Sequence, residues 1–225
     1  DITEQKRQQR QKEMLMEVSH VINIAQHLDE LCLNAGEHIA QFMEIPSKFV
    51  CIYRYDSRSS LLHLMAPSLV DVRVDPEVEH QIVDEKTTTI AVKTSLERKI
   101  IVSDELARSS IAAYFLSETD ALKLRTLISI PLMVQNELQG VLEVLSPKSD
   151  KYVDEDLKML TIIANELAIG ISRKRLMDEV TVKNIELENE KKKTDDANDT
   201  LKRFLATFSH ELRAPLNAIV GFSEI

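Results

Sequence analysis

The chain has 225 residues, and its 37 acidic side chains outnumber its 28 basic ones to give a formal net charge of −9 at pH 7. A nucleic-acid-binding protein would show a basic face, and a membrane-surface helix would be rich in lysine and arginine, so both classes are disfavoured. The four glycines form neither of the common glycine-rich phosphate loops, which leaves the chain without an ATP-binding loop of its own.

The cysteine content and the apolar runs indicate the compartment. Cys32 and Cys51 are the only cysteines, which is too few for a secreted disulfide scaffold and favours a reducing, cytoplasmic setting. The longest apolar run, Leu127 to Val134, is broken by polar and proline residues and is too short to cross a bilayer. The chain starts within a polar helical pattern and stops within an apolar one. We therefore expect a fragment, with membrane contact only through a span upstream of residue 1.

The first forty-odd residues are predicted to form one long helix, of which residues 1–19 would be a polar stalk. Apolar residues recur seven apart in two interleaved series, which keeps them on one helix face. Two interpretations of this face remain open: packing against the sheet of the same domain, or contact with a second copy in a parallel dimer. The two series are Val18, Ala25, Cys32 and Ile39, and Met14, Val21, Leu28, Ala35 and Phe42.

The middle of the chain mixes strand and helix patterns, which predicts an α/β fold with an antiparallel sheet. Acidic residues at the start of the last helix suit the positive end of its dipole. The expected strands are Phe49–Tyr55, Leu61–Ala66, Lys99–Val102, and a hairpin of Thr126–Val134 with Leu138–Leu145. Helices are expected over much of Ile82–Leu96, weakly over Glu105–Leu116, and from Asp154 onward, with Pro67–Pro76 irregular.

Several stretches of this region resemble the GAF domain family. Ser129–Pro147 (SIPLMVQNELQGVLEVLSP) followed by Tyr152–Ile171 (YVDEDLKMLTIIANELAIGI) is similar to the C-terminal half of such a domain. FVCIYRYD from Phe49 and KIIVSD from Lys99 stand where the family has matching strands. The resemblance covers residues 20–174 and implies a sheet with the terminal helices on one side and room for a small-molecule pocket on the other.

The sequence does not name a ligand for this domain, which binds an unknown ligand or none. The cysteine–histidine pair of bilin-binding relatives and the signature of cyclic-nucleotide-binding relatives are both absent. Cys51 is expected in the core. Glu143 lies in an otherwise apolar strand and needs a partner or a pocket, and we expect a structural salt bridge. No metal site is predicted, because five histidines are weak candidates as haem or metal ligands: His20, His27, His38, His63 and His80.

Residues 175–203 are predicted to be a coiled-coil signalling helix. After Arg173 the sequence is highly charged and has no glycine or proline before Pro215. It resembles the helices that join sensors to kinases, and its polar seam positions predict a weak, switchable coiled coil, with a solvated spacer as the alternative. The seam positions are Met177, Asn184, Lys191, Asn198, Leu205, Leu212 and Ile219, and Val180, Leu187, Thr194, Leu201, Phe208, Pro215 and Phe222.

Residues 204–225 contain the motif that carries chemistry. FLATFSHELRAPLNAI, from Phe204, closely resembles the H-box of sensor histidine kinases, the phosphoacceptor helix of their dimerisation domain. The resemblance implies that His210 accepts phosphate. Independently, Phe208 at heptad position d and Leu212 at the next a put His210 at f, the outermost position. Glu211 would orient the imidazole and act as its base.

Two further positions near His210 bear on its function. Pro215 lacks an N–H and should kink the helix beside His210. Ala214 stands where family members that dephosphorylate their regulator carry threonine or asparagine, which puts that phosphatase activity in question.

The resemblance implies the sensory and transmitter portion of a two-component sensor histidine kinase. The protein would be a homodimer, and ATP and Mg²⁺ would bind a catalytic domain beyond Ile225, so this fragment should be inactive alone. Phosphate would pass from His210 to an aspartate of a response-regulator receiver domain. Two alternatives remain: a non-catalytic GAF dimerisation or spacer module without a ligand, and a GAF-type redox enzyme using Cys51, disfavoured because those relatives use several pocket cysteines.

Overall fold

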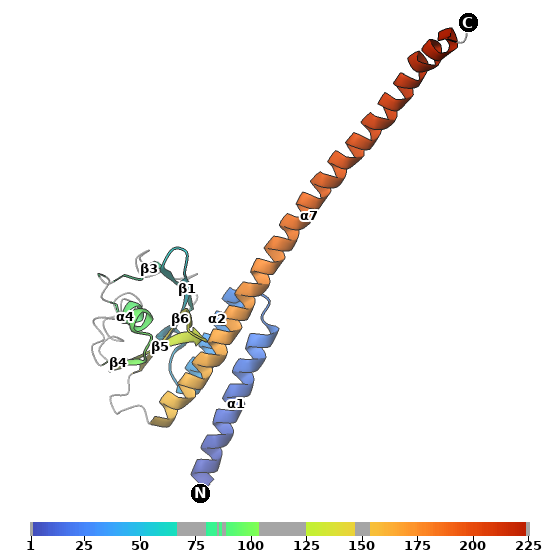
Figure 1. Ribbon diagram of the computed structural model, residues 1–225. Coiled ribbons are helices and arrows are strands. Elements are labelled where there is room, and N and C mark those ends of the chain that lie inside the picture. The colour runs from blue at the N-terminus through green and yellow to red at the C-terminus, as the bar shows by residue number, and fades with distance from the viewer. Residues whose placement is uncertain are drawn as a thin grey trace. The chain divides into compact units, whose positions relative to one another are not determined.

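The computed structural model describes residues 2–66, 80–84, 86, 89–103, 125–146 and 154–223. The chain divides into two compact units, Asp1–Arg175 and Leu176–Ile225. The first unit is built on a six-stranded antiparallel sheet, with strand order β3-β2-β1-β6-β5-β4 (Figure 1). The strands are β1 Val50–Asp56, β2 Leu61–Ala66, β3 His80–Ile82, β4 Ile101–Ser103, β5 Thr126–Val134 and β6 Glu137–Ser146.

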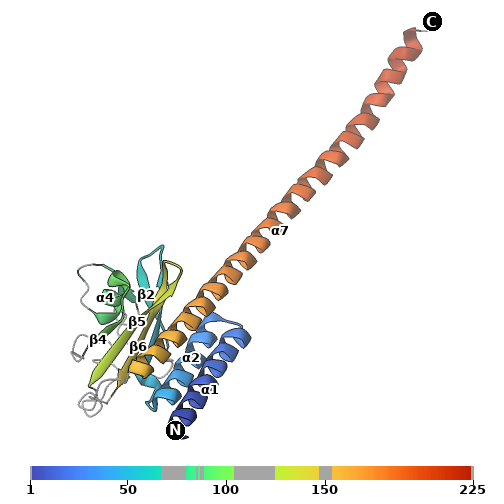
Figure 2. The same ribbon diagram turned by 60° about the horizontal axis from the view of Figure 1, so that its bottom comes forward.

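Helices cover both faces of this sheet. α1 and α2 lie on one face together with the first part of α7, whereas α4 lies on the other face (Figure 2). A 3₁₀ turn, Ser47–Phe49, leads from α2 into β1. The predicted α/β class, an antiparallel sheet flanked by helices, is confirmed. The helices are α1 Ile2–Ile24, α2 Leu28–Met43, α4 Ile90–Glu97 and α7 Asp154–Ser223.

The prediction of one helix over the first forty residues is wrong, because α1 ends at Ile24 and α2 begins at Leu28. The Glu30 carboxylate accepts from the backbone N–H of Gln26 at 2.8 Å, which stabilises the break. A helix of forty residues would be about 60 Å long, whereas a ten-residue strand such as β6 spans about 33 Å. Folding back allows both halves of the apolar seam to be buried.

The seam of α1 and α2 packs inside the first unit. Met14 and Val18 of α1 and Cys32 and Ile39 of α2 are at most 4% exposed. His38 Nδ1 of α2 lies 3.4 Å from a Glu17 carboxylate oxygen of α1, which agrees with two antiparallel neighbours. Packing within the same domain is therefore observed for these four residues. Contact of the same helices with a second copy stays a prediction.

Most predicted strands are found close to their predicted bounds, including the β5–β6 hairpin. The helix predicted from Ile82 begins later, because Ile82 pairs with Leu61 as the end of β3. α4 starts only after Thr89, whose hydroxyl caps it by accepting from Val92 N–H at 3.3 Å. The predictions for Pro67–Pro76 and Glu105–Leu116 lie outside the described residues.

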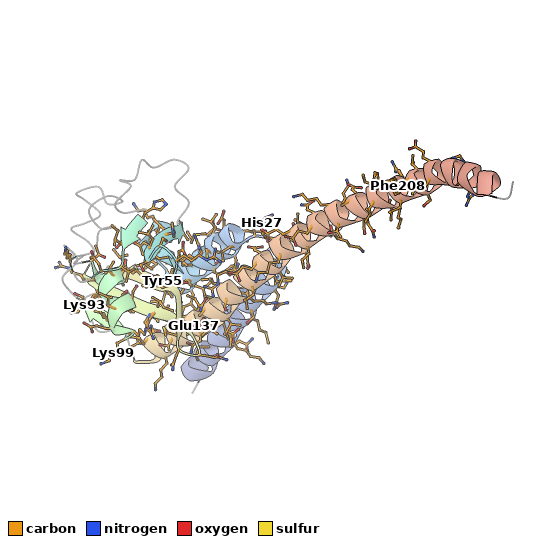
Figure 3. All side chains as sticks on the ribbon, turned by 45° about the horizontal axis from the view of Figure 1, so that its top comes forward. His27, Tyr55, Lys93, Lys99, Glu137 and Phe208 are labelled. Carbon is orange, nitrogen blue, oxygen red and sulfur yellow. The ribbon has the colours of Figure 1, made fainter. Side chains whose placement is uncertain are left out.

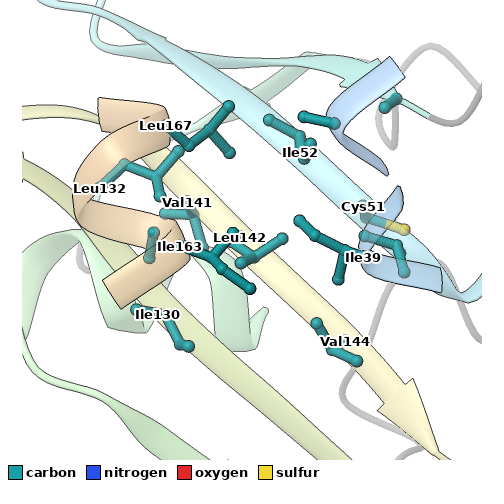
Figure 4. Packing of buried hydrophobic residues seen from close by; sticks show 14 of the residues in the cluster. Ile39, Cys51, Ile52, Ile130, Leu132, Val141, Leu142, Val144, Ile163 and Leu167 are labelled. Carbon is teal, nitrogen blue, oxygen red and sulfur yellow. The ribbon is translucent and has the colours of Figure 1, made fainter. Parts of the chain in front are cut away.

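Part of the hydrophobic core lies between the sheet and the face made by α2 and α7, and part lies under α4. Figure 4 shows Ile39 of α2 and Leu167 of α7 among strand residues that include Leu142. Each of these side chains is fully buried, and full burial of a side chain of this size contributes about 1.5–3 kcal/mol. This core fixes the sheet, and therefore the side chains on the opposite, α4-facing side.

The second unit consists of the rest of α7. From Leu176 to Arg213 every side chain is exposed, and the helical backbone continues past Pro215 to Ser223. The predicted kink at Pro215 stays a prediction. Among the described helices, none has an apolar stretch long enough to cross a membrane.

Candidate functional site

A row of polar side chains crosses the α4-facing side of the sheet. Glu143 of β6 lies directly opposite Cys51 of β1 on one side and Ser129 of β5 on the other. Residues opposite each other in antiparallel strands project to the same face. The Thr94 hydroxyl of α4 donates to the Ser129 hydroxyl at 2.8 Å, which places α4 over the row.

Glu143 is held as a neutral acid. Its side chain is 1% exposed, and burial raises its pKa from 4.5 to about 8, although a hydrogen bond from Ser129 acts in the opposite direction. The predicted salt bridge is wrong, because the partner of the carboxyl is this hydroxyl. Glu143 Oε1 has no hydrogen-bond partner among the described residues. A buried oxygen without a partner is uncommon in folded proteins.

The two cysteines are buried, and both are held as protonated thiols. Burial, and then the proximity of Glu143, raises the pKa of Cys51 well above its usual value. Burial and Asp29 raise the pKa of Cys32 to about 12, although Arg54 lowers it. Because the thiolate is the nucleophile, neither cysteine is suited to redox catalysis in this state. Cys51 is therefore a core residue, as predicted, and the redox-enzyme alternative loses its catalytic group.

The position of α4 depends on its first turn. Thr89, its N-cap, also donates to Gln81 Oε1 of β3 at 2.6 Å, and Gln81 is 2% exposed. At the other end, Arg98 donates to the backbone carbonyl of Asn136 in the β5–β6 turn at 2.9 Å. These two contacts tie one end of α4 to β3 and the other to the β5–β6 turn, and they fix Thr94 above Ser129.

The five histidines of the first unit do not converge. His38 pairs with Glu17, whereas the His63 and His80 rings meet edge-to-face across β2 and β3 at 4.8 Å. His20 and His27 are exposed. In the described part of the chain, no group of three or more metal-ligating side chains gathers in one place.

His210 lies on α7 in the second unit, and both His210 and Glu211 are exposed. Phe204 and Phe208, one turn apart, stack with ring centroids 5.8 Å apart on the helix surface, where Figure 3 labels Phe208. Consecutive residues of a helix do not face each other, so the predicted pairing of Glu211 with the imidazole requires a specific rotamer. The roles of His210 and Glu211 stay predictions.

The apolar seam residues of α7 are uncovered in the single chain. Met177, Val180, Leu187, Leu201, Leu205, Phe208 and Leu212 are 43–62% exposed. Other apolar residues outside the seam, Val182 and Ile185, are exposed to a similar extent.

A family model for the GAF domain matches residues 25–172, more than half of the chain. The chain belongs to the GAF domain family. Its GAF domain is also similar in fold to the GAF domain of a phosphoenolpyruvate-protein phosphotransferase from Coxiella burnetii. That structure has a TM-score of 0.58 and 15% sequence identity, over 76% of this chain and 98% of the other.

Two curated relatives are histidine kinases. The circadian input-output histidine kinase CikA of Synechococcus elongatus is 25% identical over 210 residues, which cover 85% of this chain. Hybrid signal transduction histidine kinase G of Dictyostelium discoideum is 29% identical over 106 residues, which cover 45% of this chain. The matches span only 26% and 3% of the two relatives. A GAF domain with histidine kinase relatives supports a sensory signalling role.

Sequence reasoning identified Glu143 and Cys51 but missed Ser129 and Thr94. Ser129 was visible only as a polar interruption of an apolar strand. Its position beside Glu143 depends on a register shift in the hairpin, between Leu132 and Met133. Thr94 gave no signal, because a threonine within a short helix is common and its contact with Ser129 joins residues 35 positions apart.

Proposed function

We propose that the chain is the sensory and transmitter portion of a two-component sensor histidine kinase. In this proposal, a signal received by the GAF domain controls ATP-dependent phosphorylation of His210. The observation that carries the proposal is the H-box sequence, whose histidine is exposed on α7, the same helix that begins at Asp154 within the GAF unit. The histidine kinase relatives support it as well.

The chemistry at His210 is a phosphoryl transfer. A ring nitrogen of the imidazole attacks the γ-phosphorus of ATP, an N–P bond forms, and the bond to the ADP oxygen breaks. Glu211 accepts the proton on the other ring nitrogen or holds the ring for attack. ATP and Mg²⁺ would be bound by a catalytic domain outside residues 1–225. The phosphohistidine would then pass its phosphoryl group to a response-regulator aspartate.

The proposed assembly is a homodimer that pairs along α7. The uncovered seam residues lie seven and three or four apart, so a second parallel helix would bury them. Asn184, Lys191 and Asn198 interrupt the seam. Polar residues at such positions lower the stability of the pair and can fix its register. A weak pair of this kind suits a signal that needs only a few kcal/mol to change the balance between two states.

The test uses the full-length protein incubated with [γ-³²P]ATP and Mg²⁺. We expect acid-labile, base-stable label on the wild type and none on His210→Gln. His20→Gln, which changes an exposed histidine of α1, serves as the matched control and should keep the label. Label retained in His210→Gln would contradict the role of His210. A wild type that takes up no label would favour the non-catalytic spacer.

A further inference from the structure

The polar row on the α4-facing side of the sheet has no role in the phosphoryl transfer proposed for α7. Its members, Cys51, Glu143, Ser129 and Thr94, come from β1, β6, β5 and α4, and each is at most 1% exposed. A polar row in the centre of a core is costly unless every polar atom has a partner. The partners of Glu143 therefore decide what the row can do.

Glu143 is only half satisfied. Ser129 donates to the carboxyl, and Thr94 in turn donates to Ser129 at 2.8 Å. Glu143 Oε1 has no hydrogen-bond partner among the described residues. A carboxyl group in either protonation state needs a group opposite this oxygen, a donor when it is ionised and an acceptor or donor when it is neutral.

The described elements around Glu143 do not supply a positive charge. Cys51 on β1 is its ionisable neighbour and remains a neutral thiol, because burial raises its pKa. On α4, Lys93 is exposed and lies 3.8 Å from Glu97, and Arg98, just after α4, donates to the Asn136 carbonyl. Ser129 of β5 is uncharged, and Arg54 of β1 lies three positions from Cys51, on the opposite face.

We infer that Glu143 anchors a binding site for a small organic cation, a guanidinium or primary ammonium compound, on the α4-facing side of the sheet. The inference rests on the proposed sensory role of the GAF domain and names the ligand class that this domain would sense. Such a cation donates to the buried, unpartnered Glu143 Oε1 and forms a buried, hydrogen-bonded ion pair, which is the arrangement in which buried charges are tolerated.

Binding is linked to a proton. The neutral acid has to lose its proton before it pairs with a cation, and its pKa is about 8. Below that pH, each further fall of one pH unit therefore lowers the affinity for the cation about tenfold, and above that pH the affinity becomes constant. At pH 7 the complex should release close to one proton.

The experiment uses this 225-residue chain with N-propylguanidinium and n-butylammonium as probes and N-propylurea as the neutral control. Thermal unfolding is followed at pH 6, 7, 8 and 9, and calorimetric titration at pH 7 in two buffers counts the protons released. We expect at least one of the two cations to raise the wild-type melting temperature in a concentration-dependent way, more at pH 8 than at pH 6, and N-propylurea to have no effect.

Two variants separate the carboxyl group from its surroundings. Glu143→Gln should lose the effect of the cations while remaining folded by circular dichroism. Ser129→Ala keeps the carboxyl but removes its hydrogen bond, so it should still bind and reach constant affinity at a higher pH. If Glu143→Gln does not fold, the inference is tested by the pH dependence of cation binding to the wild type and by its shift to higher pH in Ser129→Ala.

Three outcomes would overturn the inference: equal stabilisation of Glu143→Gln and wild type, equal effects of N-propylurea and N-propylguanidinium, or no effect of either cation at any pH. None of these outcomes bears on the labelling of His210. A protein that labels His210 but binds no cation would leave the proposed kinase function intact and remove only this ligand class.

Discussion

At the scale of single residues, Glu143 shows how position within the sheet changes the chemistry of a side chain. The same carboxyl group on the surface would be ionised at neutral pH. In the centre of β6 it is buried, with one hydroxyl partner, and its pKa rises to about 8. The sequence indicated that this residue needs a partner, but the partner is a neutral serine and the proton therefore stays on the carboxyl at pH 7.

The raised pKa predicts how stability depends on pH. Between pH 4.5 and about 8, Glu143 is ionised in the unfolded chain and neutral in the folded one, so folding takes up a proton. The stabilisation that this proton gives the folded state is fully present below pH 4.5 and is lost as the pH rises to about 8. Over that range the folding equilibrium constant falls by up to tenfold for each pH unit. Glu143→Gln should remove this loss, measured by urea unfolding between pH 5 and 9.

A control on the same strand tests whether the effect belongs to this carboxyl. Glu137 is exposed at the start of β6, and Glu137→Gln should keep the wild-type decline in stability with pH. If both variants lose the decline, or if neither does, the assignment of the proton to Glu143 would be wrong.

The buried thiols lead to a second prediction at this scale. Cys32 and Cys51 are 0% exposed, and burial raises the pKa of both. The folded protein should therefore react with Ellman's reagent at pH 8 only as fast as it unfolds, and both thiols should react at once in denaturant. Ser57→Cys, in the exposed turn after β1, should give one fast-reacting thiol. Rapid reaction of the wild type would contradict the burial.

At the scale of elements, the β5–β6 hairpin decides which polar residues meet. Val134 pairs with Glu137, but the pairing shifts by one residue between Leu132 and Met133. Without this shift Ser129 would lie opposite Leu142, on the other face from Glu143, because a one-residue slip exchanges the two faces of a strand. The hydrogen bond between Ser129 and Glu143 thus depends on an irregularity several residues away.

The centre of the same sheet depends on Gly140. A Cβ atom at this position would fall on the backbone carbonyl oxygen of Tyr53 in the neighbouring strand, which cannot move without breaking the β1–β6 pairing. Gly140→Ala should therefore destabilise the domain by about 1–3 kcal/mol, measured by chemical denaturation.

Gly36 of α2 provides the matched control for that substitution. A Cβ atom there would lie 3.4 Å from the Ala66 Cβ, an ordinary contact. Gly36→Ala should be neutral or stabilising by up to about 1 kcal/mol, because alanine favours a helix interior over glycine. Equal losses in the two variants would mean that the local backbone approach at Gly140 is not the cause.

At the scale of the whole molecule, the exposed seam of α7 predicts contact with a second chain. Leu187 and Leu201 are seam residues, whereas Val182 and Ile185 lie outside the seam with similar exposure, 54–62% for all four. If two chains pair along the seam, Leu187→Glu with Leu201→Glu should give a monomer by light scattering. Val182→Glu with Ile185→Glu adds the same charge and should leave a dimer. Equal effects of the two pairs would contradict the proposed seam.

The sequence by itself determined the properties that depend on local pattern. The strands of β1, β2 and the β5–β6 hairpin, the start of α7 at Asp154, and the H-box around His210 all follow from periodicity, turn residues or a contiguous motif. Each of these signals is contained within a few neighbouring residues, so no knowledge of the remaining chain is needed to find it.

Only the tertiary structure decided how the local pieces meet. The chain reverses between α1 and α2 because one forty-residue helix would be longer than the strands that it covers. A heptad pattern carries no information about that length. The register shift in the hairpin brought Ser129 to Glu143, and α4 brought Thr94 to Ser129 across 35 positions of sequence. Burial then raised the pKa of Glu143 and kept its carboxyl protonated. This desolvation depends on everything packed around the residue and not on the residues beside it in the chain.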